Sequence, residues 1–188
     1  MSTFKALRVH RVEGGTQARF DMVSLHDLTP GEVVIRVAYS CLNYKDALAV
    51  SGKAPITRGA VRVAGIDLSG VVESSTDGSF APGDQVLVTG SNVGESLDGG
   101  FAQFARVPAQ AVVPLPAQLG LFEAMVLGTA GFTAAMAVCA DAAEPSGRRS
   151  RADRRDRPDG RSGQHRARHP EARRFRDRRH QREGECGG

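Results

Sequence analysis

Cysteine and histidine, the side chains that most often act as nucleophiles, bases or metal ligands, are few in this 188-residue sequence. The cysteines stand at positions 41, 139 and 186, which gives neither an even disulfide framework nor a C-x-x-C metal pair. We expect Cys41 to be a small apolar core residue rather than a reactive thiol. His10 and His26 are expected on the surface. The cysteines and these two histidines therefore predict no catalytic base and no metal site.

The polar motif "NYKD" at 43–46 offers more. Asn43 can cap a helix, and Asp46, three residues on, is typical of a capping-box acid. On residue type alone, Tyr44 is more typical of a protein core, and Lys45 and Asp46 are typical of a solvated first turn. The motif thus predicts a helix start, which Gly52 would end.

Two further polar residues stand in apolar surroundings. Asp67, in "VAGIDLSGVV", is interpreted as a polar residue that favours a turn. Thr129, in "LGTAGFT", is interpreted as a hydroxyl bonded within its own helix. Thr129 has a second interpretation, as part of a ligand site, that depends on the wider pattern described below.

The elements that would position these residues are mostly strands. Short Val- and Ile-rich segments recur at close spacing, bounded by Gly, Pro, Asp and Ser, which predicts a β-barrel or sandwich. The segment 121–138 is instead rich in Ala, Leu and Met and predicts a helix that is apolar on most faces. Gly128 and Gly131 permit a break in it, or close approach to another backbone.

Composition divides the chain near Val138. Up to that residue there are 10 Lys and Arg against 12 Asp and Glu, whereas 139–188 carries 15 Arg and 9 acids with no Leu, Ile, Val or Met. Such a segment buries too little apolar surface to offset the entropy of ordering, so we expect it to be disordered. We see no apolar run near the roughly 20 residues that span a bilayer, and no signal peptide, so we expect a cytoplasmic protein without membrane contact.

Six motifs in order, "SCLNYKDALAVSGK", "VAGIDLSGVV", "FAPGDQVLVTG", "NVGE", "GGFAQFARVPAQAVVPLP" and "LGTAGFTAAMAV", resemble the zinc-independent medium-chain dehydrogenase/reductases over residues 3–138. The pattern is similar to their acrylyl-CoA reductase and quinone-oxidoreductase-like branch. The resemblance implies a mainly β, GroES-like barrel domain at 1–124 and the start of an inter-domain helix at 125–138. An α/β Rossmann domain would follow in the family, but the residues at 139–188 do not have the sequence of one.

The same resemblance implies the chemistry. Zinc-using relatives carry Cys where Asn43 stands and Gly-His-Glu at 65–67, where this chain has Gly-Ile-Asp, so it implies no metal. It implies NADPH as cofactor, with Tyr44, Asn43 and Thr129 near the nicotinamide, and hydride transfer to an enoyl-CoA thioester or a quinone. No catalytic residue is assigned. Family members are commonly dimers joined through the Rossmann domain, so we expect that interface to be missing.

When the codons of the arginine-rich segment are read starting one base later, they can encode a regular pattern of small and apolar residues. Shifted in this way, 153–157 can encode "TVVTG", 159–164 "TGGVGS", 165–170 "IALAIL" and 173–176 "VGFA". This is the strand, Gly-rich turn and apolar helix of a dinucleotide-binding unit. We therefore interpret 139–188 as an out-of-frame remnant of the Rossmann domain, with the frame change between about Val138 and Gly147.

Without the phosphate-binding loop, the chain as written is expected to show no reductase activity. The alternative hypothesis is a GroES-like binding module whose basic tail contacts nucleic acid non-specifically. That tail has a single aromatic residue for stacking, Phe175, and acids are interspersed, so we expect such binding to be adventitious.

Overall fold

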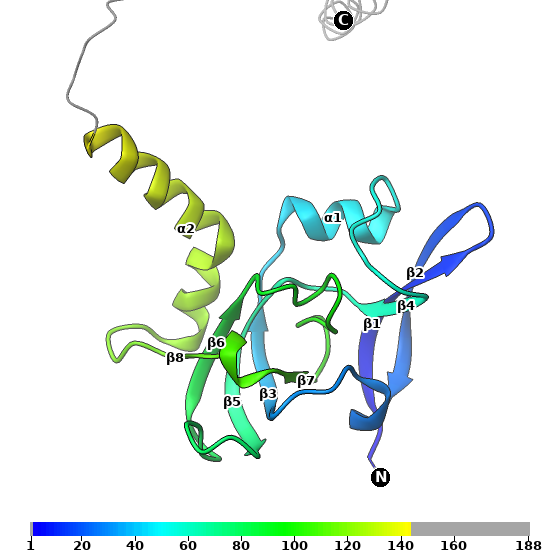
Figure 1. The fold of residues 1–188 in the computed structure, drawn as a ribbon, viewed down its shortest axis with the longest axis horizontal. Coiled ribbons are helices and arrows are strands. Elements are labelled where there is room, and N and C mark those ends of the chain that lie inside the picture. Colours follow the sequence, from blue (N-terminus) through cyan, green and yellow to red (C-terminus); the bar gives the residue numbers. More distant parts are fainter. Residues whose placement is uncertain (1, 144–188) are drawn as a thin grey trace, which may run out of the picture. The chain divides into compact units, whose positions relative to one another are not determined.

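The fold is taken from a computed structural model that describes residues 2–143. Its strands form two antiparallel sheets, with the strand orders β2-β1-β4 and β7-β3-β5-β6-β8 (Figure 1). The strands are β1 Phe4–Val12, β2 Gly15–Val23, β3 Val33–Ser40, β4 Val61–Val63, β5 Asp67–Ser75, β6 Gln85–Thr89, β7 Phe104–Val107 and β8 Val113–Pro114. The helices are α1 Tyr44–Ser51 and α2 Leu121–Ala143, with 3-10 turns at Leu25–Asp27 and Ala109–Ala111. The mainly β class is confirmed.

The segment 101–103 links the two sheets. The backbone N–H of Leu7 donates to the carbonyl of Phe101 at 2.8 Å, and that of Gln103 donates to the carbonyl of Lys5 at 3.3 Å. Because Gln103 directly precedes β7, these bonds connect β1 to the larger sheet and bend the whole into a partly closed barrel.

Each sheet has its own apolar core, built from the inward-facing residues of its alternating strands. The larger cluster gathers buried side chains of β3, β5, β6 and β7, among them Ile35, Leu68 and Val86. The smaller one, around Phe4 and Val63, lies under β1. Val dominates the larger cluster, because branched side chains pack well on a pleated surface.

Helix α1 follows the predicted caps. The backbone N–H of Asn43 donates to Asp46 Oδ2 at 2.9 Å, as a capping box requires. At the other end, Gly52 has φ 68° and its N–H bonds to the carbonyl of Ala49. The positive φ explains why glycine ends the helix. One expectation was wrong: Asp46 is only 2% exposed, so the first turn is not solvated at that residue.

Helix α2 is bent, as its glycines suggested. Gly128 has φ 48° and ψ −162°, far from helical values, and divides α2 into two parts. Before the kink, Ala124 and Met125 are buried against the barrel; after it, the large apolar side chains are exposed, namely Phe132, Met136 and Val138. The helix runs to Ala143, so residues 139–143 are helical and were wrongly assigned to a disordered tail. The remainder of that tail, with its out-of-frame interpretation, lies outside the described residues.

The span Leu121–Ala142 is long and apolar enough, by length and composition, to cross a membrane. This departs from our expectation of no such run. The kink, and the burial of Met125 against the barrel, argue that its first turns belong to the globular domain. The part beyond the kink is shorter than the roughly 20 residues a bilayer requires.

Candidate active site

The carboxylate of Asp67, the first residue of β5, is the centre of a buried polar cluster. Its side chain is fully buried. Oδ2 accepts hydrogen bonds from Cys41 Sγ at 3.1 Å, from Asn43 Nδ2 at 3.0 Å and from the Thr129 backbone N–H at 2.8 Å. Oδ1 accepts the Thr129 hydroxyl at 2.6 Å. One carboxylate thus joins the segment before α1, the start of β5 and the kink of α2, which the interpretation of Asp67 as a turn residue had missed.

Thr129 lies directly after the kink, and Gly128 makes its two bonds possible. A Cβ at Gly128 would lie 2.7 Å from Cys41 Sγ and 3.0 Å from Asp67 Oδ2, and the φ of 48° is itself unfavourable for other residues. The Thr129 hydroxyl is not bonded within its own helix, as one interpretation had it. Thr133 is the residue that makes that bond, to the Thr129 carbonyl at 2.7 Å.

Cys41 is half-buried and donates to Asp67 rather than packing as a simple apolar residue. Burial raises the pKa of the Cys41 thiol to about 12, with further contributions from the hydrogen bond to Asp67 and the charge of that carboxylate. The thiol therefore stays protonated near neutral pH. It can act as a hydrogen-bond donor, but neither as a thiolate nucleophile nor as a thiolate ligand.

A second buried carboxylate lies on the first turn of α1. Asp46 accepts the backbone N–H groups of Asn43 at 2.9 Å and Ile66 at 3.0 Å, so it ties α1 to the residue before Asp67. Burial raises the pKa of Asp46, and the negative charge of Asp67 adds to the rise, although the two backbone bonds oppose it. The two acids together fix Asn43: one holds its backbone and the other its side chain.

The three residues assigned to the cofactor by resemblance are placed differently. Asn43 and Thr129 meet at Asp67. Tyr44 does not join them: it is 80% exposed at the start of α1, so it is no core residue. Its neighbour Lys45 is exposed and forms an ion pair with Glu95 at 2.8 Å, as expected of a solvated turn.

Histidine takes no part in this cluster. His26 is exposed, as expected. His10 is not: its side chain is 14% exposed, and Nε2 lies 2.7 Å from Asp21 Oδ2 across the β1–β2 hairpin. Within residues 2–143 no three His, Cys, Asp or Glu side chains gather closely enough to hold a metal ion.

Two serines also support the site and were not singled out from the sequence. Ser69, fully buried on β5, donates to the carbonyl of Leu121 at 2.7 Å and so fixes the start of α2. Ser40, at the end of β3, donates to the carbonyl of Asp67 at 3.1 Å. The available signal was the run "IDLSG", in which polar residues alternate with apolar ones on a strand buried on both faces.

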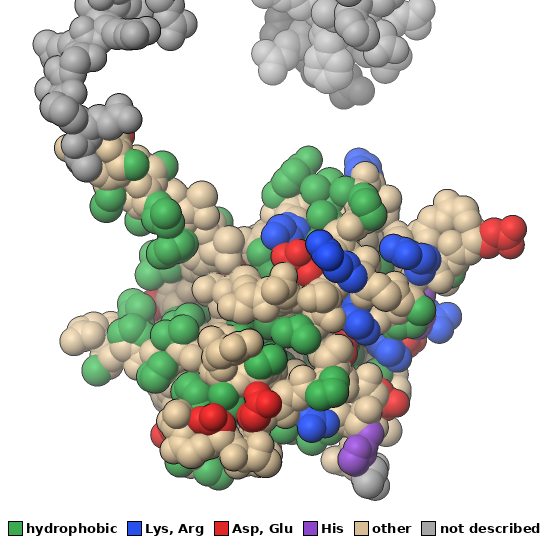
Figure 2. Space-filling model, in the orientation of Figure 1, with side chains coloured by type: hydrophobic (Ala, Val, Ile, Leu, Met, Phe, Trp, Pro, Cys, Tyr) green, Lys and Arg blue, Asp and Glu red, His purple; other side chains and the backbone are tan. Residues whose placement is uncertain are grey.

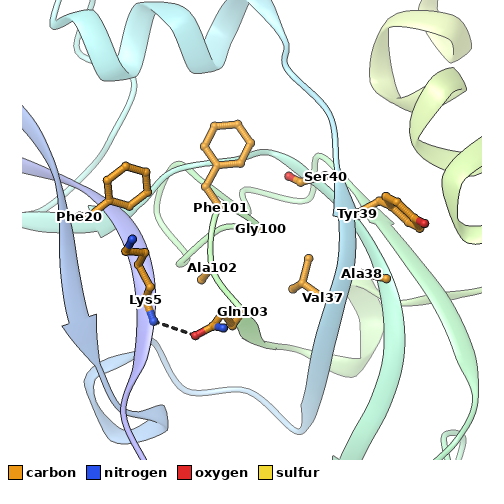
Figure 3. A pocket seen from close by; sticks show the side chains of 10 residues that line it. All are labelled: Lys5, Phe20, Val37, Ala38, Tyr39, Ser40, Gly100, Phe101, Ala102 and Gln103. Atoms are coloured by element: carbon orange, nitrogen blue, oxygen red, sulfur yellow. Dashed lines mark hydrogen bonds between the residues drawn. The ribbon is translucent and has the colours of Figure 1, made fainter.

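A cleft of about 360 Å³ lies beside the end of β3 that leads to Cys41 (Figure 3). Its walls come from β1, β2, β3 and the 100–103 segment, and they carry the aromatic rings of Phe20 and Phe101, whereas the Tyr39 ring turns away toward Phe122 of α2 (Figure 3). The Lys5 ammonium lies 5.1 Å from the centre of the Phe20 ring. The volume is within the range of small-molecule sites, and the lining is mixed apolar and polar, as such sites usually are.

Comparison with known proteins identifies the fold. The alcohol dehydrogenase GroES-like domain matches residues 29–117. The chain is 48% identical over 139 residues to acrylyl-CoA reductase AcuI of Ruegeria pomeroyi, and 46% identical over 139 residues to the putative quinone oxidoreductase YhfP of Bacillus subtilis; each match covers 73% of this chain. The YhdH oxidoreductase of Salmonella enterica in complex with NADP has a TM-score of 0.70 at 44% identity over 72% of this chain.

The chain spans only 42% of the length of each of these proteins. The chain therefore belongs, through its GroES-like domain, to the medium-chain dehydrogenase/reductases, in the branch that includes acrylyl-CoA reductases and quinone-oxidoreductase-like proteins.

Proposed function

We propose that this chain is the GroES-like part of a cytoplasmic NADPH-dependent reductase that reduces the double bond of an α,β-unsaturated acyl-CoA thioester, or alternatively a quinone. The observation that carries the proposal is the Asp67 cluster. It joins Asn43 and Thr129, both assigned to the cofactor side by family resemblance, through one buried carboxylate. The similarity to acrylyl-CoA reductase AcuI supports the choice of substrate class.

The reaction requires a hydride and a proton. Bound NADPH would supply the hydride to the β-carbon of the substrate; the electron pair of the double bond then moves to the thioester oxygen as an enolate, and the α-carbon takes a proton. The enolate oxygen needs hydrogen-bond donors. Tyr44, the residue after Asn43, has an exposed phenol, so we propose that it contacts the cofactor or the enolate.

Thr129 and Asn43 have narrower roles. The Thr129 hydroxyl proton is given to Asp67, so only the oxygen lone pairs remain for a ligand. The Asn43 amide donates to Asp67 Oδ2 at 3.0 Å and, more weakly, to Cys41 Sγ at 3.6 Å, so both bonds orient it. We propose that Asp67 orients both groups and does not itself contact the substrate, because its side chain is fully buried and its two oxygens are taken up by four hydrogen bonds.

The described residues fit the nicotinamide end of NADPH better than its phosphates. The ring and hydroxyl of Tyr44, next to Asn43, are exposed. The large apolar side chains of α2 beyond the kink, such as Phe132, are exposed as well. No Gly-rich phosphate loop follows α2 in the printed sequence. We therefore expect the 188-residue chain to oxidise no NADPH, and to lack the family dimer interface.

The test compares two proteins. The first is the 188-residue chain; the second is made from the same gene with the register restored near codon 140. We expect NADPH oxidation with acrylyl-CoA only in the second, and loss of most of that activity in its Tyr44→Phe variant if the phenol acts as donor. Turnover by the first protein, or stop codons in the shifted register, would contradict the out-of-frame interpretation. Quinone turnover without acrylyl-CoA turnover would select the other acceptor.

A further inference from the structure

A second cavity, of about 360 Å³, lies at the far end of α1 from Asn43. It is formed by the end of the β1–β2 hairpin and by the segment that follows α1. Residues 11, 12, 15 and 16 line it from the hairpin, and residues 52–55 and 57 line it from the segment. The backbone N–H of Arg11 donates to the carbonyl of Ala60 at 2.8 Å, which holds the two walls together.

The charged side chains of this cavity are both basic. Arg11 and Lys53 line it, and no carboxylate of residues 2–143 lies within ion-pair distance of either. By contrast, Arg19 is paired with Asp21 and Lys45 with Glu95. Figure 2 shows Lys and Arg side chains gathered over this half of the visible face, around α1, β4 and the hairpin.

Two hydroxyl groups complete the lining. Thr57 is 8% exposed, and no hydrogen-bond partner is found for its side chain in the described part of the chain. Thr16 Oγ1 is fully buried and also lacks a partner. Thr16 lies directly opposite Arg11 in the hairpin register, so their side chains share one face. Buried polar groups without partners are uncommon in proteins and call for an explanation.

We propose that this cavity is a binding site for a phosphate group of an anionic ligand. Arginine matches phosphate oxygens with a rigid fork of donors, lysine adds a point charge, and threonine hydroxyls donate to the remaining oxygens. The partial negative charge of the α1 C-terminus opposes an anion here. Two full positive charges on Arg11 and Lys53 outweigh that half charge.

Two sources could provide the phosphate: the phosphorylated end of a CoA thioester, or a free phosphorylated metabolite. The eight residues of α1 separate the cavity from Asn43 by about 12 Å. A CoA substrate whose acyl end lies at the Asp67 cluster has a long flexible arm that would cross this distance. Assignment to CoA rests on the proposed function, whereas phosphate binding does not.

The experiment measures how fast an acetylating reagent modifies Lys53 in the full 188-residue chain, with mass spectrometric quantification and with Lys45, which pairs with Glu95 and lines neither cavity, as internal reference. The probes are inorganic phosphate, adenosine 3′,5′-bisphosphate, which is the CoA end, and adenosine 2′,5′-bisphosphate, which is the NADPH end. A probe at ten times its Kd should slow Lys53 acetylation roughly tenfold and leave Lys45 unaffected. Stronger protection by the 3′,5′ than by the 2′,5′ isomer assigns CoA; equal protection assigns a free phosphate.

Variants keep the test specific. Arg11→Gln should raise the Kd of the probe about tenfold, the worth of one charge-assisted hydrogen bond, and Thr57→Val should raise it less. Arg36→Gln, a change at an exposed residue of β3, is the matched control and should have no effect. The proposal is overturned if no probe protects Lys53, if Lys45 is protected equally, or if the Arg11→Gln variant is protected like the control. None of these outcomes depends on reductase activity.

Discussion

The Asp67→Ala substitution removes the acceptor of four hydrogen bonds from a fully buried position. The part-buried backbone N–H of Thr129 would then have no acceptor, and the Asn43 amide would keep only its weak bond to Cys41 Sγ at 3.6 Å. Each unsatisfied donor costs about 1–3 kcal/mol. We expect the free energy of unfolding to fall by about 3–5 kcal/mol, a large part of the stability of a small domain.

Asp67→Asn separates hydrogen bonding from charge. If the new amide oxygen takes the place of Oδ2, it still accepts from Cys41, Asn43 and the Thr129 N–H. The new NH₂ then takes the place of Oδ1 and donates to the Thr129 hydroxyl, which reverses its role. Because only the charge assistance is lost, we expect a cost of about 1–2 kcal/mol.

The assay is urea unfolding of the 188-residue chain, followed by circular dichroism of the β-sheet signal, with Thr129→Val as the third variant. Thr129→Val alone should cost about 1–3 kcal/mol, and adding it to Asp67→Ala should cost much less than that, because both remove the same bond. Full additivity would refute the idea of a shared cluster. So would Asp67→Ala within about 1 kcal/mol of the parent, a difference too small for unsatisfied buried donors.

Further predictions concern the kink and the thiol. Gly128→Ala should destabilise by about 1–3 kcal/mol in the same assay, because its Cβ meets Cys41 Sγ at a positive φ; Gly131→Ala, whose Cβ meets Leu127 at an ordinary 3.5 Å, should be neutral or stabilise by up to about 1 kcal/mol. A thiol reagent at pH 8 should label exposed Cys139 quickly and Cys41 only after unfolding, and equal rates would contradict its raised pKa of about 12. Since the folded pKa of Cys41 lies above its ordinary 9.0, its contribution to stability should be complete below pH 9 and lost between 9 and 12. Cys41→Ser, which does not titrate there, should lack this part of the pH dependence.

Local rules were enough to predict α1 and the kink. The cap residues Asn43 and Gly52 act through bonds within a few positions of themselves, so their spacing in the sequence determines the outcome. Gly128 was likewise visible as an interruption in an apolar helix. The β class followed from the spacing of short Val-rich strands, which depends on turn residues more than on distant contacts.

The Asp67 cluster could not be predicted in the same way, because its bonds join residues far apart in sequence. Thr129 and Asp67 are 62 positions apart, and no periodicity within either segment records their contact. The exposure of Asp46 was predicted wrongly for the same reason. Its place in a capping box is a local feature, whereas its burial comes from contact with the backbone of Ile66 on another segment. His10 was misplaced because its partner Asp21 is brought to it by the hairpin register.

The kink of α2 explains why one chain can combine a well-packed barrel with an uncovered apolar helix. Before Gly128 the helix is held to the barrel by Ser69 and by buried Met125; directly after it, Thr129 is held by Asp67. Beyond these bonds nothing in the described part of the chain covers Phe132. The cluster is thus the last point at which the barrel controls the direction of α2. In a protein that continues into a second domain, the same carboxylate that orients Asn43 would also set the direction in which that domain begins.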